Sequence, residues 1–136
     1  MVEIDIVYEG DLRCRAIHGP SGSGIATDAP VDNQGRGEAF SPTDLLATAL
    51  GTCMMTTMGI FARRKGIDLA GSRVRVVKEM VADPLRRVGR VGVVLDLPGR
   101  LAPAERQALE NAAHTCPVHK SLHPDVSIDV VFRYDL

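Results

Sequence analysis

Cysteine residues carry the strongest chemical signal in this sequence. The 136-residue chain has three of them, Cys14, Cys53 and Cys116, which lie far apart. A secreted protein that depends on disulfides usually has a denser, even-numbered set. The first residues, MVEIDIVYEG, alternate apolar and polar side chains and do not resemble a secretion signal. These features predict a cytoplasmic protein, in which a pair of thiols is more often catalytic than structural.

Cys116 directly precedes Pro117 and can cap the short helical segment PVHKSL. The N-terminus of a helix presents free N–H groups and partial positive charge, and both favour a thiolate. The neighbouring His114 and His119 can add positive charge. The alternative is a cysteine that ends a helix and has no chemical role.

The histidines around Cys116 must also be considered as a metal site. Zinc binds such residues, but structural zinc sites usually show closer paired spacing, such as two cysteines separated by two residues. Pro117 also restricts the backbone inside the cluster. We therefore expect no metal and no other cofactor, and a zinc site is kept as the alternative. The cluster consists of His114, Cys116, His119 and His123.

Cys53 lies in the middle of an uncharged stretch, residues 45–62. A single cysteine on a buried helix is usually a small apolar residue without reactivity. Reactivity would require a positive charge that the rest of the fold brings close to the thiol. Arg13 and Arg15 share one face of a predicted strand and are candidates for that charge, whereas Cys14 points to the opposite face and is expected in the core.

Six segments have the features of β-strands. The N-terminal residues alternate apolar and polar side chains, as a half-buried strand does. Residues 19–40 are rich in glycine and polar residues and are expected to form a loop with one short strand. A turn at Asp83-Pro84 joins two further strands into a hairpin. The predicted strands are residues 2–8, 12–18, 24–28, 72–81, 88–97 and 126–134.

Helix signals are clear at two places. Ser41 can cap a helix, and Pro42 suits its first position. This helix is expected to end at Lys65, because a glycine follows. A second helix, AERQALENAAHT, is expected to begin at Pro103, and a short third one to follow Cys116.

The uncharged stretch raises the question of a membrane-spanning helix, which needs about 20 apolar residues. Its threonines and glycines lower its hydrophobicity and no second such stretch occurs, so we expect a helix that is buried on all sides. A chain of this length has too little material to surround that helix, which predicts a homodimer. The alternative is a sheet wrapped around a single helix.

The charge balance excludes some classes of partner. The chain has 16 basic and 17 acidic residues and a formal net charge of −1. There is no electrostatic reason to expect binding to nucleic acid or to an anionic membrane.

Two long motifs resemble a known family. They are GEAFSPTDLLATALGTCMMTTMGIFARRKGIDL and, much later, AAHTCPVHKSL. Together with the order of the predicted elements they resemble the OsmC/Ohr family of osmotically induced and organic hydroperoxide resistance proteins. The resemblance implies an α+β fold in which two central helices pack on antiparallel sheets in an intertwined homodimer. It also implies that residues 1–136 form a single domain.

The resemblance further implies a thiol-dependent peroxidase that prefers organic hydroperoxides. On it, Cys53 is the peroxidatic residue, which is oxidised to a sulfenic acid, and Cys116 is the resolving residue, which closes a disulfide. An external dithiol then reopens the bridge by exchange, and in related proteins this reductant is often a lipoyl group. The implied partners are thus a hydroperoxide substrate, a dithiol reductant and a second copy of the chain.

The sequence departs from the peroxidase branch of the family in one respect. That branch usually has a Glu ten residues before the first Cys, in an Asn-Pro-Glu pattern, where the Glu holds a catalytic Arg. The matching position here is Thr43, and Asp44, nine residues before Cys53, should face the opposite side of the helix. Glu38 is therefore the candidate substitute, and Arg13 is the candidate arginine.

Two alternatives follow from this departure. Glu38 can instead be a solvated loop carboxylate with no role in the site. The chain can also be a non-catalytic OsmC-like dimer that binds a small ligand in an interface pocket, with idle cysteines.

Overall fold

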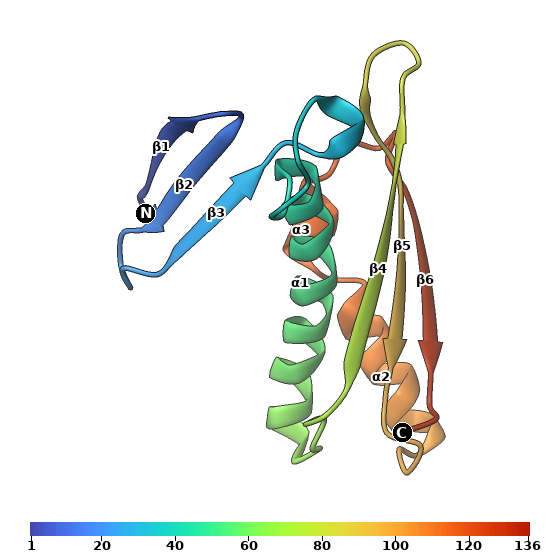
Figure 1. The fold of residues 1–136 in the computed structure, drawn as a ribbon. Coiled ribbons are helices and arrows are strands. Elements are labelled where there is room, and N and C mark those ends of the chain that lie inside the picture. Colours follow the sequence, from blue (N-terminus) through green and yellow to red (C-terminus); the bar gives the residue numbers. More distant parts are fainter. The chain divides into compact units, whose positions relative to one another are not determined.

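A computed structural model describes residues 1–136, which form two compact units, Met1–Leu46 and Ala47–Leu136. Each unit is described by itself below, and Figure 1 labels the elements of both. The prediction of a single domain stays a prediction.

The first unit contains an antiparallel three-stranded sheet in the order β1-β2-β3. Three consecutive residues with positive φ, from Gly10 to Leu12, form the tight turn between β1 and β2. All three strands were predicted from the sequence, including the short β3. Their bounds are Ile4–Gly10, Arg13–His18 and Gly24–Asp28.

The loop after β3 contains a short 3₁₀ helix, Val31–Asn33, and returns to the end of that strand. The Gly37 N–H donates to the Ala29 carbonyl at 3.2 Å, and an isolated bridge pairs Thr27 with Phe40. Gly35 passes so close to the Ala29 carbonyl that a Cβ there would lie 1.7 Å from the oxygen. Glycine is therefore required at this position for the loop to close.

Helix α1, Pro42–Lys65, begins in the first unit and continues through the second. At its start, the Ser41 N–H donates to Asp44 Oδ2 at 2.9 Å and the Asp44 N–H donates to Ser41 Oγ at 3.1 Å. Gly66 follows with φ of +68°, the left-handed conformation that ends many helices. Both predicted ends of this helix are confirmed.

The second unit contains a three-stranded sheet in the order β4-β5-β6 (Figure 1). Strands β4 and β5 form the predicted antiparallel hairpin, but β5 and β6 run parallel. Parallel neighbours need a crossover connection, and α2 and α3 supply it between β5 and β6. The bounds are β4 Arg73–Val81, β5 Arg87–Asp96, α2 Pro103–Ala113, α3 Pro117–Ser121 and β6 Ser127–Arg133.

Helices α1 and α2 lie on the same face of this sheet. A Cβ on Gly51 of α1 would lie 2.7 Å from Val76 Cγ1, so the helix backbone runs directly over β4. Beyond the end of α2, the ring of His114 contacts the ring of Phe132 of β6, and Val76 and Phe132 belong to one face by the strand register. The apolar core lies in this unit and comprises Ala47, Leu50, Met54, Met58, Ala62, Val88, Val91, Val93, Leu95, Leu97, Leu101, Leu109, Ala113 and Cys116.

Within one chain, α1 is buried on one side only. The buried positions recur every three or four residues along a single stripe, while Thr52, Thr56 and Ile60 on another face are exposed. Only 33% of the most apolar window of this helix is buried, although the helix is long and apolar enough to cross a membrane. The prediction of burial on all sides is therefore not met by the single chain.

Candidate functional site

Cys53 and Cys116 contact each other in the second unit. Cys53 lies in the middle of α1 and is half-buried, whereas Cys116 precedes α3 and has no exposed surface. The Cys53 thiol lies close enough to raise the pKa of the Cys116 thiol, and both cysteines carry free thiols. Residues 63 positions apart in the sequence are thus brought together by the packing of α1 against the junction of α2 and α3.

Cys116 caps α3, as predicted. Its Sγ accepts a hydrogen bond from the His119 N–H at 3.4 Å, and Pro117 occupies the first position of the helix. Its own N–H donates to the Ala113 carbonyl at 3.3 Å. Hydrogen bonds on both sides of the residue hold the thiol in place at the end of the core.

The environment of Cys116 favours the neutral thiol. Burial raises the pKa of the Cys116 thiol, and the neighbouring Cys53 thiol raises it further, while the backbone N–H groups of His119 and Val118 lower it. The net direction is upward. The N–H groups at the start of α3 favour the thiolate as expected, but desolvation outweighs them in this one-turn helix, so the expected net effect is not found.

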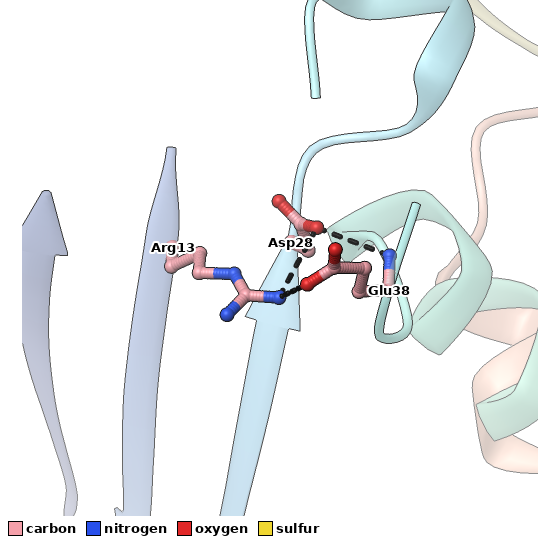
Figure 2. A network of polar contacts seen from close by, with 3 residues as sticks. All are labelled: Arg13, Asp28 and Glu38. Atoms are coloured by element: carbon pink, nitrogen blue, oxygen red, sulfur yellow. Dashed lines mark hydrogen bonds and ion pairs between the residues drawn. The ribbon is translucent and has the colours of Figure 1, made fainter. Parts of the chain in front are cut away.

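The first unit brings Arg13 and Glu38 together (Figure 2). Arg13 Nη2 lies 2.5 Å from Glu38 Oε2, so the candidate arginine and the candidate substitute carboxylate form an ion pair. Glu38 is therefore not an unpaired loop carboxylate. Arg15 pairs with another carboxylate: its Nε lies 3.6 Å from Glu9 Oε2, and both of these side chains are exposed.

A third residue, Asp28, completes this network. Its Oδ2 lies 3.6 Å from Arg13 Nη2 and accepts a hydrogen bond from the Glu38 N–H at 3.1 Å (Figure 2). The Asp28 side chain has no exposed surface, and its Oδ1 has no hydrogen-bond partner. The Glu38 N–H lowers the pKa of Asp28 most strongly, against the effect of burial, and the charge of Arg13 lowers it further. Asp28 is thus a buried, ionised carboxylate.

Asp28 was missed by the sequence reasoning, which placed it only at the end of a short strand. Its signal is its position opposite Arg13 in the antiparallel pair, since Arg13 and Asp28 are direct partners in the register. That register cannot be read from a glycine-rich loop of unknown geometry.

Two other residues considered in the sequence, Asp44 and Cys14, do not belong to this site. Asp44 closes the cap of α1 with Ser41, which accounts for its presence nine residues before Cys53. Cys14 is half-buried and outside the apolar core, contrary to expectation.

The histidines do not form a metal site. No group of three or more His, Cys, Asp or Glu side chains is arranged to hold a metal ion. His114 packs against Phe132, His123 lies 3.7 Å from Asp125, and His119 has a buried Nδ1 without a partner.

Comparisons with known proteins agree with this architecture. A family model described as OsmC-like protein matches residues 35–131. A solved structure from Psychrobacter arcticus 273-4, described as a candidate osmotic stress induced and detoxification response protein, is 51% identical, with a TM-score of 0.91 over 97% of this chain and 96% of that chain. No curated protein matches the chain.

More distant structures share the fold. An organic hydroperoxide resistance protein OsmC from Legionella pneumophila is 18% identical, with a TM-score of 0.78 over 98% of this chain and 96% of that one. The organic hydroperoxide resistance protein OhrB of Bacillus subtilis is 18% identical, with a TM-score of 0.72 over 98% of both chains.

Proposed function

Because the chain belongs to the OsmC-like family, we propose that it is a thiol-dependent peroxidase that reduces organic hydroperoxides through Cys53 and Cys116. The observation that carries this proposal is the proximity of the two thiols, one on α1 and one at the start of α3, which is close enough for Cys53 to raise the pKa of Cys116. Two solved structures of the same fold are described as organic hydroperoxide resistance proteins, which supports the substrate class.

The chemistry uses the two sulfurs in sequence. The Cys53 thiolate attacks the distal peroxide oxygen and the O–O bond breaks; the leaving alkoxide takes a proton and departs as an alcohol, and Cys53 becomes a sulfenic acid. Cys116 then attacks the Cys53 sulfur, a disulfide forms, and the hydroxyl leaves as water with the proton of the Cys116 thiol. An external dithiol returns both residues to thiols by exchange and is itself oxidised to a disulfide.

The surroundings of the two cysteines fit a reaction in which Cys53 is the nucleophile and Cys116 the resolving thiol. A thiolate is the nucleophile toward peroxide, and a buried neutral thiol such as Cys116 does not compete for that step. Arg13 is the proposed source of positive charge for the Cys53 thiolate and for the peroxide, since a guanidinium stays charged and offers several donors. Glu38 is proposed to hold that arginine.

We further infer a homodimer in the cytoplasm. A second copy would cover the exposed apolar face of α1, and a reducing compartment keeps the free thiols available for turnover.

Stopped-flow consumption of an organic hydroperoxide, with a dithiol present, tests the proposal. We expect the wild type to consume peroxide and Cys53→Ser to lose the activity at least about a thousandfold, because the nucleophile is absent. Cys116→Ser should still consume about one equivalent of peroxide in a single turnover and then leave a sulfenic acid that a cyclic dione traps.

Cys14→Ser is the matched control, because Cys14 lies outside the proposed chemistry and should be replaceable without loss. Equal and negligible rates for the wild type and Cys53→Ser would show that the protein is not a peroxidase, as the non-catalytic alternative requires.

A further inference from the structure

We propose that Asp28 is a positioning residue, which holds both the guanidinium of Arg13 and the loop that carries Glu38 in the arrangement that the peroxidase reaction needs. The inference rests on the proposed function and goes beyond it, because it assigns the geometry of the arginine to a buried carboxylate instead of to Glu38 alone.

The strand register places Asp28 next to Arg13. The two residues are direct partners in the antiparallel β2–β3 pair, so their side chains leave the sheet on the same face. The charged groups lie at ion-pair distance, 3.6 Å from Arg13 Nη2 to Asp28 Oδ2. The strand register therefore places the Asp28 carboxylate on the same side of the sheet as the guanidinium.

The same carboxylate also closes the loop between β3 and α1. Asp28 Oδ2 accepts the Glu38 N–H at 3.1 Å, and the Asp28 N–H donates to the Phe40 carbonyl at 3.1 Å. Both ends of the loop thus meet at one residue. Loss of the carboxylate would release the backbone of Glu38 as well as the side chain of Arg13.

Asp28 is the buried one of the two carboxylates that pair with Arg13. The Glu38 side chain is 54% exposed and the Asp28 side chain is 0% exposed. Water screens an exposed ion pair strongly and screens a buried charge much less. The ion pair between Arg13 and Asp28 is therefore screened less by water than the shorter one between Arg13 and Glu38.

The Asp28 carboxylate is ionised in the pH range in which the thiols react. The Glu38 N–H and Arg13 keep its pKa below the ordinary value, so the carboxylate is ionised over the whole range in which thiols titrate. The groups that lower its pKa are Arg13 and the backbone N–H groups of Glu38 and Ala29. The Glu38 carboxylate lies against the same guanidinium nitrogen, Arg13 Nη2, as the Asp28 carboxylate does. Asp28 Oδ1 has no hydrogen-bond partner. It could accept from the guanidinium if Arg13 shifted slightly, and the Arg13–Asp28 ion pair would then be kept.

The test measures the pH profile of Cys53 alkylation by iodoacetamide in a Cys14→Ser/Cys116→Ser parent, where Cys53 is the only thiol. Asp28→Asn keeps an acceptor for the Glu38 N–H and removes the charge. We expect the midpoint of the profile to rise by about one pH unit and the first-turnover rate with peroxide to fall about tenfold, because a displaced Arg13 no longer favours the thiolate. Glu38→Gln should produce a smaller rise.

The sign of the shift separates positioning from a simple field effect. Removal of a negative charge without movement of Arg13 would lower the midpoint, and either a lower or an unchanged midpoint in Asp28→Asn overturns the proposal. In an Arg13→Gln background, Asp28→Asn should change the midpoint no further, and a further rise would also overturn it.

Folding is checked by circular dichroism, and Asp28→Glu is the second variant. It keeps the charge on a longer arm, and a midpoint equal to that of the parent would contradict a positioning role. If the parent itself fails to consume peroxide, the proposed function fails, whereas the alkylation profiles still report on Asp28.

Discussion

At the scale of single residues, the two cysteines differ because their surroundings differ. Cys116 is fully buried and its pKa is raised, first by burial and then by contact with Cys53. A resolving thiol needs proximity to the sulfenic acid more than it needs ionisation in the resting enzyme. In the proposed mechanism, this burial would keep peroxide away from Cys116 until Cys53 has reacted.

The raised pKa of Cys116 predicts a dependence of stability on pH. The folded state binds the thiol proton more tightly than the unfolded chain, so the contribution to the free energy of unfolding is fully present below about pH 8.5. It is lost as the pH rises through the folded pKa. We therefore expect the wild type to lose stability between pH 8 and pH 10 relative to Cys116→Ser, in urea unfolding with a phosphine reductant.

Cys116→Ser is the appropriate reference for this measurement, because its hydroxyl can still accept the His119 N–H and does not titrate in this range. A constant difference in stability across the range would show that the thiol is not perturbed in the folded protein.

Residue types and the family resemblance singled out Cys53, Cys116, Arg13 and Glu38 as candidates, but could not give the pairing of Arg13 with Glu38 or of Cys53 with Cys116. The pairing of Arg13 with Asp28 depends on the β2–β3 register, which the glycine-rich segment concealed. The state of Cys116 depended on burial, which overrode the local helix signal. Both are effects of tertiary packing.

At the scale of elements, α1 is fixed against β4 by a close approach at Gly51. A Cβ at that position would lie 2.7 Å from Val76 Cγ1 and 3.2 Å from Val74 Cγ1. Alanine favours helices by about 1 kcal/mol over glycine, but overpacking costs about 1–3 kcal/mol. We expect Gly51→Ala to lower the free energy of unfolding by up to about 2 kcal/mol in chemical denaturation.

A double-mutant cycle with Val76→Ala checks the cause. The smaller side chain removes the nearest clash, so Gly51→Ala should cost less in the Val76→Ala background than in the wild type. Equal costs in both backgrounds would mean that the close approach to β4 is not responsible.

The elements differ in how far the sequence determines them. The ends of α1 could be predicted because Ser41, Pro42 and Gly66 act locally. The parallel pairing of β5 with β6 could not, because it depends on where the α2–α3 crossover returns the chain. Periodicity identifies strands and says nothing about their neighbours.

At the scale of the whole molecule, apolar surface is unevenly covered. The buried apolar residues all belong to Ala47–Leu136, whereas Ile4, Ile6 and Tyr8 of β1 are exposed. An isolated three-stranded sheet needs an apolar face that packs against something to be stable in water. Exposed apolar surface of this extent is typical of an interaction site.

The proposed homodimer accounts for the exposed face of α1, and Ile60 tests it. Ile60 is 52% exposed in the single chain and lies on the face with Thr52 and Thr56. We expect light scattering after size exclusion to give twice the chain mass of 14.6 kDa for the wild type. Ile60→Glu should shift the mass toward a single chain, because a buried unpaired carboxylate costs several kcal/mol at an apolar interface.

Leu85→Glu is the matched control, since Leu85 is equally apolar and 75% exposed in the turn between β4 and β5, and it should leave the mass unchanged. A wild type that remains at 14.6 kDa at high concentration would contradict the dimer. The exposed face of α1 would then be covered by another partner or by a membrane. Partition of the wild type into vesicles would distinguish these two cases. A dimer that Ile60→Glu does not weaken would instead place the interface on the exposed side of β1.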